Sequence, residues 1–101
     1  MEIDITGRHF HVSEALKDYA TQKALKLEKY SLKLEAMHVV LEVQKFQHIA
    51  EITLLGKHLR LTAKEKSTDM YAAFDSCFGN IQLQVRRQHD KVKDHKARRY
   101  P

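Results

Sequence analysis

The sequence has few of the residues on which disulfides, phosphate loops and membrane spans depend. Its 101 residues include one cysteine, one proline, three glycines and no tryptophan. A single cysteine, Cys77, excludes a disulfide within the chain, which suits a reducing compartment. No apolar run approaches the ~20 residues that a membrane-spanning helix needs, and the first residues lack the basic-then-apolar pattern of an export signal. We therefore expect one soluble domain that is located in the cytoplasm.

Patterns typical of catalysis or metal binding are also missing. The three glycines are far apart, which excludes a glycine-rich phosphate loop. No two of the seven histidines have the i, i+4 helical spacing with an acidic partner that one kind of zinc site requires. Ser76 and Cys77 lie in no nucleophile-elbow motif, and the acids are scattered singly rather than paired for acid–base work. We expect no metal, no cofactor, no small-molecule substrate and no enzymatic activity.

Positive charge is concentrated at the C-terminal end. Residues 86–101 contain seven Lys or Arg and two Asp, whereas the other 85 residues carry eleven charges of each sign, so the formal charge of +5 lies in the last sixteen residues. Such a segment indicates a polyanionic partner, with nucleic acid first and an acidic protein or an anionic membrane second. The alternative is a solvated helix end, because cations also favour helix C-termini.

Hydrophobic periodicity predicts the element order β-α-β-β-β-α. Alternation predicts a half-buried strand at residues 2–6 that Gly7 ends, followed by a helix that Ser13 caps and that runs to about residue 30. The positions of this helix that face the core are Leu16, Ala20, Ala24 and Leu27. Three further strands within residues 37–64, with short links at residues 47–48 and 56–57, predict an antiparallel meander. The sheet has one apolar face and one polar face, so we expect helices on one face only.

A long final helix is predicted from residue 70, with Thr68 or Asp69 as its N-cap. Its apolar stripe consists of Met70, Phe74, Cys77, Phe78, Ile81, Val85 and Val92. Two features argue against it. Gly79 destabilises a helix interior by about 1 kcal/mol relative to Ala, and residues 80–85 alternate like a strand after a turn. The stripe keeps its phase through Gly79, so we favour the helix.

On the first helix, two lysines and two tyrosines flank the core stripe on one side. They are Tyr19, Lys23, Lys26 and Tyr30. Two cations between two aromatic rings suit a nucleic-acid backbone. The alternative is that these amphipathic side chains cover the edge of the core, with only their polar ends in water.

Two motifs, in combination with the element order, connect the chain with a family. The first helix carries the pattern EAL…K..KLEKY, and the last helix opens with DMYAAFD. With these motifs the chain resembles the ribosome hibernation factors over about residues 3–95, and more narrowly the short hibernation promoting factors of the ribosome-associated inhibitor and ribosomal subunit interface protein superfamily. The resemblance implies an α+β fold in which two helices pack on one face of a four-stranded sheet, similar to a double-stranded-RNA-binding domain.

The resemblance also implies a function and a partner. Members of this family bind small-subunit ribosomal RNA (rRNA) in the channel that tRNA and messenger occupy. They block translation and store inactive ribosomes, in pairs for the short members, in starved or stationary-phase cells. The chain shows neither the acidic C-terminal extension of the ribosome-associated inhibitor branch nor room for the second, dimerising domain of the long members. We expect a single ribosome-binding domain at residues 1–95 and a frayed basic tail at residues 96–101.

Matching the family motifs assigns residues to the rRNA contact. Lys23 and Lys26 match basic positions of the first helix, Asp69 and Tyr71 belong to the motif that opens the last helix, and Arg87 and Lys91 match cations on that helix. The chain departs from the family where basic residues are usual, since it has Asn80 and Leu83 there. We expect other cations to compensate, and the predicted rRNA-binding residues are Lys23, Lys26, Asp69, Tyr71, Arg86, Arg87, Lys91 and Lys93.

Two other functions remain open at this point. One is a regulator that docks on a non-ribosomal protein partner through the polar sheet face or through Leu83. The other is a generic binder of structured RNA with no preference for ribosomes.

Overall fold

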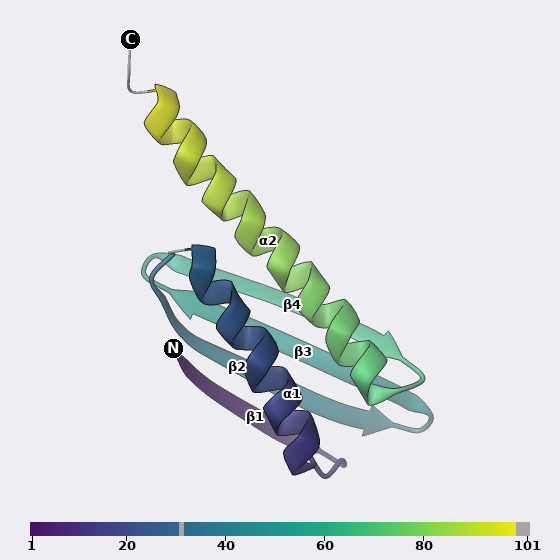
Figure 1. Ribbon diagram of the computed structural model, residues 1–101. Helices are drawn as coiled ribbons and strands as arrows, with labels where there is room; N and C mark the ends of the chain where they lie inside the picture. Colours follow the sequence, from purple (N-terminus) through teal and green to yellow (C-terminus); the bar gives the residue numbers. More distant parts are fainter. Residues whose placement is uncertain (31, 99–101) are drawn as a thin grey trace.

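The computed structural model of the chain describes residues 1–30 and 32–98, with side chains up to residue 91 (Figure 1). Its elements follow the order β-α-β-β-β-α, which confirms the predicted α+β class. They are β1 (Glu2–Arg8), α1 (Glu14–Leu25), the 3₁₀-helix η1 (Lys26–Tyr30), β2 (Leu34–Gln44), β3 (Gln47–Gly56), β4 (Leu59–Ser67) and α2 (Met70–Arg98).

The four strands form one mixed sheet in the order β1-β2-β3-β4. Strand β1 is parallel to β2, with α1 as the crossover between them, whereas β2, β3 and β4 pair antiparallel as the predicted meander. Both helices cover the same face of the sheet (Figure 1). Each helix follows a strand that points in the direction of β2 and returns along the sheet, so the two helices run in the same direction and end at the same end of the molecule.

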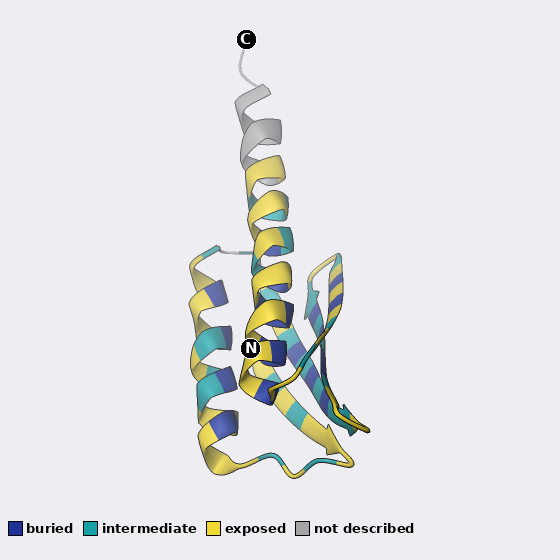
Figure 2. Cartoon of the chain, turned by 90° about the vertical axis from the view of Figure 1, so that its right-hand side faces the viewer, coloured by how far each residue is buried: buried dark blue, intermediate teal, exposed yellow. Residues whose placement is uncertain are grey.

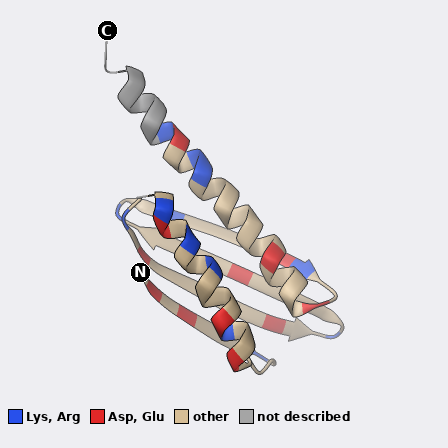
Figure 3. Ribbon diagram, viewed as in Figure 1, with Lys and Arg blue, Asp and Glu red and all other residues tan. Residues whose placement is uncertain are grey.

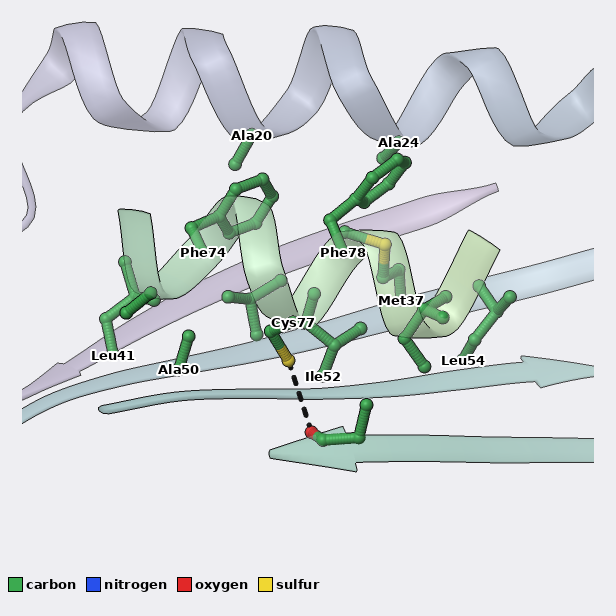
Figure 4. Close-up of a cluster of buried hydrophobic side chains, with 14 of the residues drawn as sticks. Ala20, Ala24, Met37, Leu41, Ala50, Ile52, Leu54, Phe74, Cys77 and Phe78 are labelled. Carbon is green, nitrogen blue, oxygen red and sulfur yellow. Dashed lines mark hydrogen bonds between the residues drawn. The ribbon is translucent and has the colours of Figure 1, made fainter. Parts of the chain in front are cut away.

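The core lies between the helices and the sheet, where the buried residues of both layers face one another (Figure 2). The predicted core positions of α1 and η1 and those of α2 from Met70 to Val85 are all less than 5% exposed; the side chain of Val92 lies outside the described part. The rings of Phe74 and Phe78 stack at 5.9 Å and lie against Ala20 and Ala24 of α1 (Figure 4). Small residues on α1 therefore make room for the large ones on α2.

Cys77 is a core residue, as its place on the stripe predicts. Its thiol donates to the carbonyl oxygen of Ala63 in β4 at 3.3 Å (Figure 4). Burial is the main cause that raises the pKa of Cys77 to about 12. The thiol is therefore protonated at neutral pH, and the thiolate that a nucleophile needs is not formed.

Both hairpin links are shifted from their predicted positions, and in each a non-glycine residue adopts left-handed backbone. Strand β2 also begins earlier than predicted, at Leu34, and β4 ends later, at Ser67. The link between β2 and β3 is Lys45–Phe46 rather than residues 47–48, with φ of 56° at Lys45. The link between β3 and β4 is Lys57–His58, with φ of 63° at His58. Turn residues of this kind are usually glycine or asparagine, so the sequence indicates the two links only to within one or two residues and does not mark Lys45 and His58 as the turn positions.

Gly7 does not end β1, which continues to Arg8. The chain folds back directly after the strand, and a Cβ atom at Gly7 would collide with the carbonyl oxygen of Phe10. The glycine is required by this close approach of backbone rather than by a turn at its own position. The first helix also differs, since its α-helical part ends at Leu25 and η1 completes it.

Both helices begin with the predicted kind of cap. The hydroxyl of Ser13 accepts a hydrogen bond from the backbone N–H of Leu16 at 3.1 Å. The carboxylate of Asp69 accepts one from the N–H of Ala72, also at 3.1 Å, which makes Asp69 rather than Thr68 the N-cap of α2.

A tyrosine–carboxylate hydrogen bond links the two helices. The hydroxyl of Tyr19 on α1 donates to Oδ1 of Asp75 on α2 at 2.6 Å, and its ring lies edge-on to Tyr71 at 5.2 Å. This hydrogen bond is the largest cause that raises the pKa of Tyr19 to about 12, followed by burial and by the negative charge of Asp75. The protonated phenol is the form that the fold stabilises.

We expect Tyr19→Phe to lower the free energy of unfolding by about 1 kcal/mol at pH 7, because it removes this hydrogen bond. The pKa of Tyr19 is about 12 in the folded protein, against 10.0 for an ordinary tyrosine, so the unfolded chain loses this proton first as pH rises. The hydrogen bond therefore stabilises the folded state fully below pH 10, and its contribution to the free energy of unfolding is lost as pH rises through about 12. Urea titrations of both proteins at a series of pH values measure the difference. It should be constant up to about pH 9 and shrink towards pH 12; a difference that does not depend on pH would contradict the assignment.

The two glycines outside the hairpins should respond to alanine in opposite ways. No atom lies within 4 Å of a Cβ placed at Gly79, so Gly79→Ala should stabilise α2 by about 1 kcal/mol. Gly7→Ala should destabilise the fold by about 1–3 kcal/mol, because the collision with Phe10 forces the backbone to move. Urea midpoints of the two variants test the pair, and a loss of stability in Gly79→Ala would show that its site is more crowded than described.

Candidate nucleic-acid interface

Charge is separated along the two helices. Acids predominate near the starts of α1 and α2, whereas lysines and arginines predominate towards the ends of the helical segments, where only Glu28 and Asp90 lie among the described cations (Figure 3). Because the helices run in the same direction, the cations of both gather in the helical layer at one end of the molecule. We call this group the cationic ridge, and its members are Lys23, Lys26, Lys29, Arg86, Arg87 and Lys91.

Most charges of the cationic ridge face water and have no acidic partner within the described side chains. Lys26, Arg86 and Arg87 are exposed, and Lys23 is half-buried. No described carboxylate oxygen lies within 4.0 Å of their charged nitrogens. Lys17, near the start of α1, differs in this respect, since its ammonium lies 3.8 Å from Glu14. The unpaired cations are therefore available to an external anion.

The tyrosines next to the cationic ridge belong to the helix–helix contact. Tyr19 and Tyr30 are both half-buried and pack against the core, and Tyr30 lies edge-on to His89 of α2 at 5.6 Å. The ammonium of Lys23 lies 5.5 Å from the Tyr19 ring centroid, and that of Lys29 lies 5.2 Å from the Tyr30 ring centroid. The sequence allowed two interpretations of this segment, a nucleic-acid contact or a cover for the edge of the core. The tyrosines cover the edge of the core, whereas the lysines contact the tyrosine rings and keep their charges at the surface.

The structure brings five of the predicted rRNA-binding residues together in the cationic ridge and separates two others from it. Asp69 and Tyr71 lie at the start of α2, and at 1.5 Å per residue Tyr71 is about 24 Å along the axis from Arg87. Asp69 is occupied as the N-cap, and Tyr71, 40% exposed, lies beside Tyr19. The side chain of Lys93 lies outside the described part of the chain.

Asn80 has a structural role that explains its departure from the usual basic residue. Its amide nitrogen donates to the carboxylate of Glu65 in β4 at 3.3 Å, and its amide oxygen accepts from Gln84 at 2.9 Å. Gln84 also donates to the carbonyl oxygen of Thr62 at 3.0 Å, so the pair fixes α2 to strand β4. A lysine has no acceptor and could not complete this network. The i, i+4 spacing of the two amides is the signal that sequence reasoning missed.

Phe46 was expected within a strand, and the structure places it at the tip of the β2–β3 turn. It is 91% exposed, the largest exposure of a large hydrophobic side chain among the described residues. It lies at the end of the sheet where both helices start, opposite to the end where they finish. Lys45 and Phe46 are not usual turn residues, so residue patterning alone did not indicate that the ring faces water.

The described residues contain no group of three or more potential metal ligands. Among the described helices, none combines the length and the apolar character needed to cross a membrane.

Comparisons with known proteins agree with the fold and the motifs. The sequence model of the family described as "Sigma 54 modulation protein / S30EA ribosomal protein" matches residues 3–93. A ribosome hibernation promoting factor from Salmonella typhimurium is 37% identical over 95 residues, which is 94% of this chain and the whole of that protein. The protein of the same name from Escherichia coli K12 is 35% identical over the same share of both chains.

Two solved structures have the same architecture. The N-terminal domain of Protein Y from Thermus thermophilus has a TM-score of 0.79 at 29% identity, covering 86% of this chain and 98% of that one. A ribosomal subunit interface protein from Coxiella burnetii has a TM-score of 0.81 at 20% identity, covering 87% and 97%, and shows likeness of fold. The match over residues 3–93 and the near full-length relatives confirm the resemblance seen in the sequence: the chain belongs to the Sigma 54 modulation protein / S30EA ribosomal protein family.

Proposed function

We propose that this protein is a non-catalytic ribosome hibernation factor that binds small-subunit rRNA, occupies the decoding and tRNA channel and thereby blocks translation. Family membership supports the hibernation role. The observation that carries the rRNA contact is the cationic ridge, in which two helices present cations without a described acidic partner at one end of the helical layer. Stored, paired ribosomes in stressed or stationary cells, and a cytoplasmic site of action, follow as part of the same proposal.

Phosphate groups are the ligands that this surface fits. Each Lys or Arg that meets a phosphate displaces condensed counterions, which supplies affinity without reading sequence. The guanidinium groups of Arg86 and Arg87 can hold a phosphate through two parallel hydrogen bonds, whereas lysines act as point charges. Folded RNA presents phosphates in a fixed arrangement, so the spacing of cations on two helices that share one core can select its shape.

Residues away from the cationic ridge contribute to this proposal by positioning. Asp69 caps α2, and Tyr71 packs beside the Tyr19–Asp75 link, so both hold the helices in place. Lys93 and the basic residues after it extend the positive charge in the sequence beyond the described side chains. We keep the division into a domain at residues 1–95 and a basic tail at 96–101 as part of the proposal; α2 runs as far as Arg98.

Binding to vacant ribosomes should depend steeply on salt. About five phosphate contacts predict a slope of about −4 for the logarithm of the binding constant against the logarithm of the salt concentration. Affinity for purified small subunits between 50 and about 200 mM salt measures the slope. A nearly flat response would contradict phosphate binding. Equal affinity for naked duplex RNA would indicate a generic RNA binder instead.

Charge reversal on the cationic ridge should abolish binding. Arg87→Glu/Lys91→Glu replaces two attractions by two repulsions and should leave the protein at the top of a sucrose gradient, whereas the wild type sediments with the small subunit. The matched control is Arg60→Glu/Lys64→Glu, which changes net charge equally on exposed positions of β4 on the opposite face of the sheet. Equal losses in both variants would show that net charge, rather than the ridge, drives binding. A shift of ribosomes to paired particles in the gradient with the wild-type protein would support a role in ribosome pairing.

A substitution at Leu83 distinguishes RNA binding from docking on a protein partner. Leu83 is 45% exposed on α2, one turn before Arg87. If this face meets phosphates, Leu83→Arg should raise affinity for the small subunit several-fold and make the salt slope steeper by about 0.7–0.9. Loss of binding in Leu83→Arg, with no dependence on salt, would favour an apolar protein contact at this position.

A further inference from the structure

The β2–β3 turn carries an exposed aromatic ring beside a hollow. Phe46 is 91% exposed at the tip. Next to it lies an open hollow of about 820 Å³ between the turn and His9 of the β1–α1 connection. A second, smaller hollow on the side of β4 is lined by Phe46, Lys66 and Ser67. A single exposed apolar side chain is ordinary, but a ring between two hollows offers a face against which a flat ligand can lie.

The larger hollow is an open depression lined mostly by polar residues. Its volume of about 820 Å³ leaves room for a group as large as a nucleotide. The residues that line it and could contact a ligand are His9, Glu42, Gln44, Lys45, Phe46 and Gln47. Glu42 is half-buried, and one of its carboxylate oxygens accepts a hydrogen bond from the Gln44 amide at 3.3 Å, so this oxygen is turned to a protein donor within the hollow.

Rings, amides and ammonium groups together are what an unpaired nucleotide requires. Bases that are not stacked in a helix bind by stacking on aromatic side chains such as Phe and His, and amides can hydrogen-bond their edges. Lys45 precedes the ring and Lys66 lies across the smaller hollow, so cations flank Phe46 on both sides where the adjoining phosphates would run. An apolar pocket on a protein partner would offer no anion to this pair of cations, whereas the phosphates of a nucleotide would.

The backbone that carries the ring has a defined conformation. His9 and Lys45, on opposite sides of the hollow, both adopt left-handed backbone with φ of 52° and 56°. This conformation costs a residue with a side chain about 1–2 kcal/mol. Gln44 of β2 pairs with Gln47 of β3 directly across the turn, so the backbone of Phe46 belongs to a two-residue link of defined geometry. A base that stacks on the ring therefore requires little rearrangement of the backbone.

We propose that the hollow beside Phe46 holds an unpaired RNA nucleotide, with its base stacked on the Phe46 ring and its phosphates near Lys45 and Lys66. This contact lies at the end of the molecule where α1 and α2 begin, so it is separate from the cationic ridge. The inference rests on the proposed function for the identity of the RNA, which is that of the small subunit. It adds an attachment point at the opposite end, which fixes the orientation of the domain.

Substitutions at Phe46 distinguish a stacked base from an apolar protein contact. Phe46→Ala should weaken binding to small subunits about 5- to 150-fold, the effect of losing one base–aromatic stack. Phe46→Trp should bind at least as well as the wild type, and Phe46→Leu should lose nearly as much as Ala, because Leu has no π-face. Binding that Leu preserves and Trp weakens would overturn the inference in favour of a protein pocket. Thermal unfolding of each variant should match the wild type, since the side chain is exposed.

A second measurement separates failure of this inference from failure of the proposed function. The amide NMR signals of the wild-type protein are followed as a single-stranded oligoadenylate of six nucleotides is added at low salt. Shifts at His9 and at residues 44–47 that Phe46→Ala abolishes would uphold the nucleotide site, even if small subunits did not bind. Tight binding to small subunits by Phe46→Ala, with no shifts in this region, would overturn the site and leave the proposed function intact.

Discussion

Burial of the α2 stripe between α1 and the sheet is the interaction on which the rest of the structure depends. Phe74 and Phe78 fill the space under Ala20 and Ala24, and Cys77 reaches strand β4 below them. Replacing a buried Phe by Ala typically costs about 3–5 kcal/mol, a large part of the 5–15 kcal/mol that stabilises an ordinary domain. The Tyr19–Asp75 hydrogen bond contributes about 1 kcal/mol to stability. It joins α1 to α2 at one point and so aligns the two helices along their length.

The same packing determines where the charges lie. Both helices leave the same end of the sheet, so their C-terminal halves gather lysines and arginines that are far apart in the sequence, from Lys23 to Lys91. Without the common direction, each helix would present a few separate charges of the kind that water and salt screen within about 8–10 Å. The cationic ridge is therefore a product of topology as much as of composition, and the core that aligns the helices also maintains the cationic ridge.

The two ends of the molecule differ in their chemistry. One end offers cations on stable helices, and the other offers the Phe46 ring with polar side chains around a hollow. A ligand that spans both ends would contact the protein through phosphates at one and through a base at the other. Such a pair of contacts suits a folded RNA better than a uniform polyanion, because only folded RNA holds a splayed base at a fixed distance from a set of phosphates.

The sequence by itself predicted the features that depend on neighbouring residues. Strand alternation, the helical stripe through Gly79 and the Ser13 and Asp69 caps are such local properties. The family motifs added the class of partner. Three features needed the folded chain: the positions of the turns at Lys45 and His58, where strand pairing places non-glycine residues in left-handed backbone; the bond of Asn80 to Glu65 in β4; and the common end at which α1 and α2 gather their cations. Each depends on contacts between separate strands or helices, which periodicity does not contain.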